Sequence, residues 1–81
     1  MSPEVAAAQK KVNDLSARLH TLQAQLSDLK THEPGQTEKA HGAWQQQVDK
    51  VQHQIDAVKQ QLAVAEKELQ AVKAKAAQGG H

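Results

Sequence analysis

Apolar side chains recur along this chain at alternating intervals of three and four residues, and the pattern is interrupted only once. A repeat averaging 3.5 residues keeps one stripe of each helix facing a partner helix, as in a coiled coil. We call this stripe the seam. It is made of the a positions of the heptad (5, 12, 19 and 26 before the interruption, and 48, 55, 62, 69 and 76 after it) and of the d positions between them. Its larger aliphatic members are Val5, Val12, Leu15, Leu19, Leu22, Leu26 and Leu29 before the interruption, and Val48, Val51, Ile55, Val58, Leu62, Leu69 and Val72 after it.

The interruption is a turn at Pro34 and Gly35. Proline ends a helix and biases the residue before it away from helical torsions, and the glycine after it can adopt a positive φ. Ser2 is a good N-cap for a helix that starts at Pro3. The sequence therefore predicts a single domain over residues 1–81, with a helix over about 3–31, a turn over about 32–38, a second helix over about 39–77 and a flexible tail over 78–81.

The two helices predict their own register. If they pair antiparallel, facing seam residues have numbers that add up to 77, as in Leu22 with Ile55, and no seam layer contains a polar residue. The flanking g positions then add up to 79, which sets Glu4 against Lys75 and Lys11 against Glu68. Opposite charges at such positions fix register more than they add stability. The next layer beyond the seam would set Glu33 against Trp44.

The expected fold class is therefore all-α: two long helices forming an antiparallel coiled-coil hairpin, a helix-turn-helix rod. The 81 residues include no cysteine and one aromatic residue, so they exclude disulfide scaffolds and thick globular cores. A single seam gives marginal stability. Small residues at heptad spacing on the outer face of the second helix (Ala57, Val64, Ala71), and Ala17 with Ala24 on the first, favour dimerisation into a four-helix bundle. The alternative is that alanine is simply a strong helix former.

Catalytic, metal and cofactor sites are not expected. The five histidines form no zincin motif and no His-x₃-His pair on one helix face. His32, Glu33 and His41 near the turn could in principle supply zinc ligands, but solvated loop histidines are the simpler interpretation. No nucleophile and base lie at a recognisable spacing, and a two-helix rod lacks a concave pocket of enzymatic size. We expect no enzyme activity, no cofactor and no small-molecule substrate.

Charge gives little reason for binding to anionic surfaces. The formal net charge is +1, and the lysines near the two termini are interleaved with Glu4, Glu66 and Glu68. Nucleic-acid binding is therefore a secondary interpretation, in which the chain is a small helical hairpin dimer associated with RNA or DNA. No segment is apolar enough to span a bilayer, and no signal peptide is visible, so the default expectation is a cytoplasmic protein. Signal-independent secretion stays open.

The expected role is a non-enzymatic protein-protein interaction or assembly module, with protein partners that include a second copy of the chain. The candidate contact residues fall into two groups. Trp44 and His41 lie at the turn end, where the indole either plugs the last seam layer or anchors a partner. Ala57, Val64 and Ala71 form the outer face of the second helix.

In size and expected architecture the chain resembles two classes of helical hairpin: secretion-needle subunits, and small secreted proteins with a Trp-x-Gly motif at the turn. Trp44 lies near the turn as in the second class, but Gln45 and Gln46 follow it, so the motif is missing. Pro34 stands alone where the needle subunits have a turn with two prolines. The resemblance implies a secreted or secretion-apparatus subunit as a further alternative, and the motifs assign no family.

Overall fold

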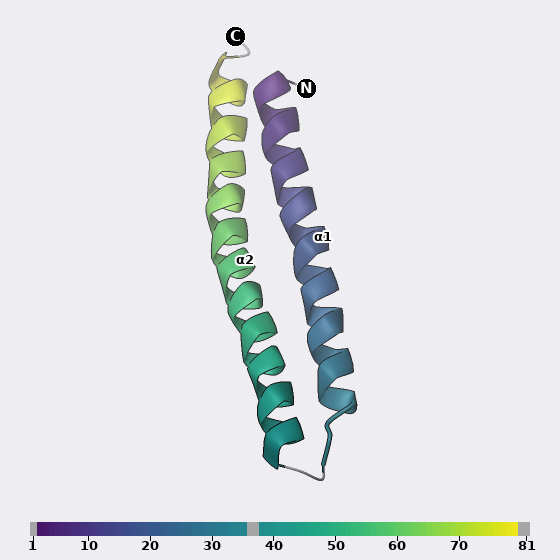
Figure 1. Cartoon of the computed structure of the whole chain (residues 1–81). Coiled ribbons are helices and arrows are strands. Elements are labelled where there is room, and N and C mark those ends of the chain that lie inside the picture. The colour runs from purple at the N-terminus through teal and green to yellow at the C-terminus, as the bar shows by residue number, and fades with distance from the viewer. Residues whose placement is uncertain (1, 36–37, 80–81) are drawn as a thin grey trace.

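In the computed structural model the chain is a hairpin of two helices, and its residues 2–35 and 38–79 are described below. Helix α1 spans Pro3–Thr31 and helix α2 spans Glu38–Gly79. The two helices run antiparallel and pack against each other along the length of α1, so that both termini lie at one end and the turn at the other (Figure 1). The predicted all-α hairpin is confirmed.

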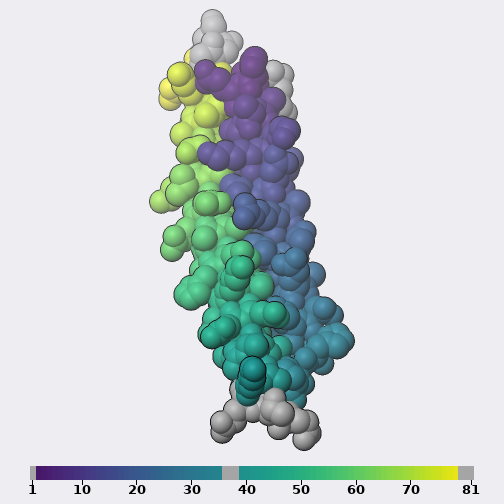
Figure 2. Space-filling view, viewed as in Figure 1, coloured from purple at the N-terminus to yellow at the C-terminus, as the bar shows by residue number. Residues whose placement is uncertain are grey.

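The molecule is a rod. Its Cα atoms extend over 67 × 15 × 12 Å, and the radius of gyration is 18.6 Å, whereas a compact domain of this length would have roughly 12 Å. The space-filling view shows α1 and α2 in contact along this rod (Figure 2). The elongated shape fits a coiled-coil rod, because each helix has only one stripe to bury.

Both ends of α1 are capped. The backbone N–H of Val5 donates to the Ser2 Oγ at 3.1 Å, so Ser2 is the N-cap and Pro3 lies in the first turn. At the other end, His32 is the C-cap with φ −113°, and its backbone N–H donates to the Leu29 carbonyl. Gly35 does not have a positive φ, so the prediction of a left-handed glycine at this turn is wrong. The cap at His32 ends α1 before Gly35 is reached.

Helix α2 is longer at both ends than the sequence predicts. It begins at Glu38, and it continues to Gly79 instead of ending near residue 77. The prediction of a flexible tail is therefore wrong for Gln78 and Gly79, while residues 80–81 of that tail and residues 36–37 of the turn lie outside the described residues. Alanine at 74, 76 and 77 favours continued helix, because it loses no side-chain entropy there.

Every seam position is buried or half-buried, with a central cluster of Leu22, Ile55 and Val58. The register agrees with the expected one, because the cluster joins Leu22 to Ile55, and the ammonium of Lys11 lies 3.5 Å from the carboxylate of Glu68. Glu4 and Lys75, which are both described, form no ion pair. The buried seam residues, each 8 % exposed or less, are Val5, Leu22, Val48, Ile55, Val58, Ala65 and Leu69.

Candidate functional site

The turn end is closed by Trp44, which is half-buried on the first part of α2. Its indole N–H donates to the Leu29 carbonyl oxygen at 2.6 Å. That carbonyl lies in the last turn of α1, where the backbone lacks the usual helical donor, and its other hydrogen bond comes from the backbone N–H of His32 at 3.3 Å. Trp44 therefore caps α1 from the opposite helix. Of the two interpretations of Trp44, this geometry fits the one in which the indole plugs the last seam layer. Its role as an anchor for a partner stays a prediction.

His41 links the turn to this tryptophan. Its Nε2 lies 3.2 Å from the Glu33 carboxylate oxygen, and its ring centroid lies 5.3 Å from that of Trp44 at an interplanar angle of 48°. The expectation that Glu33 would lie opposite Trp44 is wrong, because α1 ends at Thr31 and Glu33 no longer follows the helical register. Glu33 meets His41 instead, one helical turn before Trp44.

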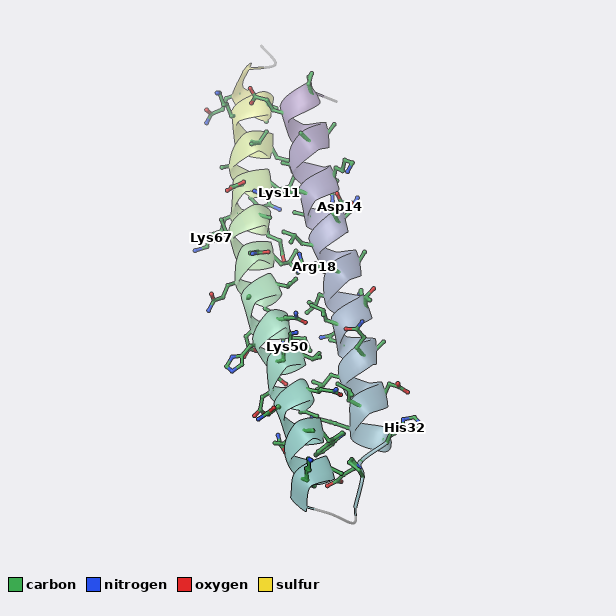
Figure 3. All side chains as sticks on the ribbon, in the orientation of Figure 1. Lys11, Asp14, Arg18, His32, Lys50 and Lys67 are labelled. Atoms are coloured by element: carbon green, nitrogen blue, oxygen red, sulfur yellow. The ribbon has the colours of Figure 1, made fainter. Side chains whose placement is uncertain are left out.

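His32 faces the other way. Its Nδ1 lies 2.8 Å from the Asp28 carbonyl oxygen and 3.4 Å from the Asp28 carboxylate, so it serves the C-terminal turn of α1 (Figure 3). The structure thus brings Glu33 and His41 together and holds His32 apart from them. Among the described residues no group of three or more His, Asp or Glu side chains is placed to hold a metal ion.

An open groove of about 800 Å³ runs beside the seam in the half of the rod that carries the termini. Its floor is apolar and comes from both helices, with Ala7 and Leu15 on α1 and Ala57 and Val64 on α2. Val64 is 55 % exposed and is the only large hydrophobic side chain of the described residues with such exposure. The groove edges are polar and are formed by Lys10, Lys11, Asp14, Gln60 and Gln61.

A second, smaller groove of about 400 Å³ lies on the same side of the seam, nearer the turn. Both grooves are lined by g and c heptad positions, so they share one long face of the rod. We call these two grooves together the groove face. The labelled side chains of Lys11 and Arg18 lie between the two ribbons in Figure 3, beside the seam. The smaller groove is lined by Gln25, Asp28, Leu29, Gln47, Lys50, Val51 and Gln54.

The opposite face of the rod, at the e and b positions, is built differently. Three glutamine amides each donate to a side-chain oxygen four residues later on the same helix: Gln9 to Asn13, Gln45 to Asp49 and Gln52 to Asp56. Gln9, Ser16 and Gln52 are half-buried there, so polar side chains cover the edge of the seam. We call this the glutamine face, and these three amides find their acceptors on their own helix.

The sequence-predicted contact residues are therefore divided between two places. Ala57 and Val64 line the larger groove, and Ala71 is exposed one heptad further along the same stripe. Trp44 and His41 lie at the turn end, near the end of α2 opposite to Ala71. Ala17 and Ala24 are exposed at f positions, on the side of α1 away from α2, so the two small-residue stripes do not form one surface.

The lysines near the termini are partly neutralised. The ammonium of Lys10 donates to the Asp14 carboxylate at 2.9 Å, and this hydrogen bond, with the attraction between the charges, raises the pKa of Lys10 above its ordinary value. Lys11 pairs with Glu68 across the hairpin. Lys67 lies on the side of α2 away from α1 in Figure 3, so these cations do not share a face.

Two features of the site were missed from sequence. The first is the capping of α1 by Trp44. The position of this tryptophan just beyond the last seam layer could have indicated it. The other is the position of Asp28 and Lys50, which line one groove from opposite helices. Their c positions put them at the same level of the rod, and the heptad assignment would have shown this.

Comparison with known proteins adds no relative: no protein-family model, no curated protein and no solved structure matches the chain. Neither described helix has a stretch long and apolar enough to cross a membrane. The arrangement of the described residues is therefore what supports a function.

Proposed function

We propose that this hairpin is a non-enzymatic protein-interaction or assembly module, that its seam packs as a coiled coil, and that it binds helices of protein partners through the groove face. The single observation that carries the proposal is the apolar groove around Val64, which lies beside a seam that is already complete. Seam positions bury their aliphatic side chains within the hairpin, so the apolar groove residues outside the seam, Val64 above all, are surplus to the fold. An amphipathic helix laid along the rod would cover it.

The surface area of the hairpin supports the same proposal. The chain exposes 6015 Å², whereas a compact monomer of its mass would expose roughly 4,800 Å². Specific interfaces remove about 800 Å² from each partner, which is comparable to this excess. Association along a long face would therefore bring the exposed surface per residue close to that of an ordinary globular protein.

The groove face is a better candidate than the turn end. At the turn end the Trp44 indole N–H and the Glu33 carboxylate already have partners within the hairpin. A partner binding there would have to replace those contacts, which costs about as much as it gains. In the larger groove, by contrast, Val64 is exposed and would gain by being covered.

Nucleic-acid binding has less support. A phosphate-binding face needs several cations that are free to replace counterions. Lys10 and Lys11 both have carboxylate partners, and Glu68 stands at the edge of the same side of the rod. An acidic side chain there would repel a phosphate backbone. The secreted-subunit alternative has no observation in its favour beyond the shape of the hairpin.

A photo-cross-linking experiment tests the proposal. A benzophenone-bearing amino acid would replace Val64 on the groove face or Ala63 on the glutamine face, and each protein would be irradiated in a lysate of its source cells. We expect a discrete adduct from position 64 and none from position 63, with the cross-linked partner peptide lying in a helix. Equal labelling from both positions, or no adduct from either, would contradict the proposal.

A further inference from the structure

The groove face is complementary to itself. We propose that its partner is a second copy of this chain, docked groove face to groove face with both turns at the same end of the assembly, so that α1 of each copy lies against α2 of the other. This inference rests on the proposed function, because it names the partner of the same face. The product would be a four-helix bundle in which every neighbouring pair of helices is antiparallel.

The dimensions of the hairpin suit this docking. A face 67 Å long and 15 Å wide has an outline of about 1,000 Å², and a specific interface needs roughly 800 Å² per partner. Since both copies have the same length and shape, the face of one can cover the face of the other from end to end. A shorter partner helix would leave part of the smaller groove open.

The charges favour this orientation. Asp28 and Lys50 line the smaller groove from opposite helices, yet they form no ion pair with each other within the hairpin. When α1 of one copy faces α2 of the other at the same level, Asp28 meets Lys50 of the second copy. The two-fold axis creates this contact twice, and the same geometry sets Lys11 near Glu68 of the second copy.

The opposite orientation is less favourable. If the two rods overlapped fully with their turns at opposite ends, the middle of α1 would lie on the middle of α1 of the second copy. Arg18 is at a g position near that point, so two arginines would face each other beside the axis. Like charges set directly opposite one another destabilise an interface and act against this register.

The small side chains allow a close approach between the helices. With α1 facing α2 of the second copy, the level of Thr21 coincides with that of Ala57, and the level of Ala7 with that of Ala71. Asp14 then lies at the level of Val64 of the second copy. The carboxylate of Asp14 is already paired with the ammonium of Lys10 at 2.9 Å, and the aliphatic part of the Lys10 side chain can cover Val64 of the second copy.

Sedimentation equilibrium of the full chain at micromolar concentrations is the first test, and we expect a concentration-dependent monomer-dimer equilibrium. The Lys50→Asp variant would set Asp28 against an aspartate at both symmetric contacts and should weaken the dimer by about tenfold. The double variant Asp28→Lys with Lys50→Asp restores opposite charges and should recover the dimer. Circular dichroism of both variants checks that the hairpin is folded. An unchanged dimer constant for Lys50→Asp, or no recovery in the double variant, would overturn the geometry.

Disulfide cross-linking then tests the orientation, since the natural chain has no cysteine. One batch would carry Thr21→Cys and the other Ala57→Cys, and the two would be mixed under mild oxidation. We expect the mixed disulfide to exceed both homodimers, because a disulfide needs Cα atoms within about 7 Å. A mixture of Thr21→Cys with Ala63→Cys, on the glutamine face, is the matched control and should stay uncross-linked. A dominant Thr21→Cys homodimer would overturn the inference.

The two proposals can fail separately. A chain that sediments as an 8.8 kDa monomer at every concentration overturns the second-copy inference. If the benzophenone at position 64 still gives a discrete adduct with another protein, the interaction function stands with a different partner. If the purified chain cross-links to itself from position 64, giving twice the monomer mass, the inference is supported.

Discussion

The seam and the groove face both carry valines of α2, but these valines have opposite surroundings. Val58 on the seam is 2 % exposed, whereas Val64 on the groove face, six residues later on the same helix, is 55 % exposed. Heptad position and not residue type decides which valine is buried, because α1 covers only one stripe of α2. The apolar side chains of this chain therefore fall into two groups, those buried between the two helices and those exposed on the groove face.

The polar side chains differ between the two long faces in the same way. On the glutamine face, three glutamine amides each donate to an asparagine or aspartate side-chain oxygen four residues later on the same helix. On the groove face, Lys50 forms no hydrogen bond or ion pair with the described residues. One long face therefore carries this row of local amide pairs, and the other carries the two grooves.

The largest effect should come from the seam. Val58→Ala removes buried aliphatic surface and leaves a cavity, so it should lower the free energy of unfolding by about 2 kcal/mol. The matched variant Val64→Ala changes an exposed site and should stay within about 0.5 kcal/mol. Urea unfolding followed by circular dichroism, at concentrations where the monomer prevails, measures both. Similar losses for the two valines would break the distinction between seam and groove face.

The second largest effect tests whether the packing of the seam continues to Trp44 at the turn end. Trp44→Phe keeps an aromatic ring but removes the indole N–H that the Leu29 carbonyl accepts. We expect a loss of about 1 kcal/mol in the free energy of unfolding, from the hydrogen bond and the smaller ring. His41→Gln leaves that hydrogen bond in place and serves as the control. If His41→Gln costs as much as Trp44→Phe, the contacts of His41 with Glu33 and with the Trp44 ring contribute as much as the indole hydrogen bond.

A smaller gain is expected from Gly42, which lies inside α2 in the part that extends beyond α1. A Cβ added there meets nothing within 4 Å. Gly42→Ala should therefore stabilise the hairpin by about 0.5–1 kcal/mol, because alanine leaves the unfolded chain less conformational freedom than glycine does. Thermal melting would show the gain. Gly35→Ala also has open space but lies outside the helices, and it should give less. Equal gains at both glycines would show that the start of α2 is not helical in solution.

The smallest effect concerns the edge of the groove. Asp14 raises the pKa of Lys10, so the pair contributes stability that is fully present below the unfolded-state pKa of this lysine. That contribution is lost as the pH rises through the folded-state pKa. Both side chains are exposed, so the melting temperature should fall only slightly more at alkaline pH in the natural chain than in Asp14→Asn. An identical alkaline profile for the two proteins would show that the pair does not form in solution.

The sequence by itself determined the architecture. The uninterrupted spacing of the seam from Val5 to Leu29 and from Val48 to Val72 required two helices with one buried stripe each, and Pro34 placed the turn between them. Equal numbers of layers on both sides then left one antiparallel register. Periodicity carries this information because a helix repeats its faces along the chain, so local spacing predicts a long-range contact.

Only the tertiary structure decided how the ends and faces are used. The capping of α1 by Trp44 depends on where α1 stops, and the meeting of Glu33 with His41 depends on the path of the chain after that point. The split between the groove face and the glutamine face depends on which flanking side chains fold over the seam. These outcomes follow from distances between side chains of different helices, and heptad spacing alone does not specify whether a flanking residue covers the seam or leaves a groove beside it.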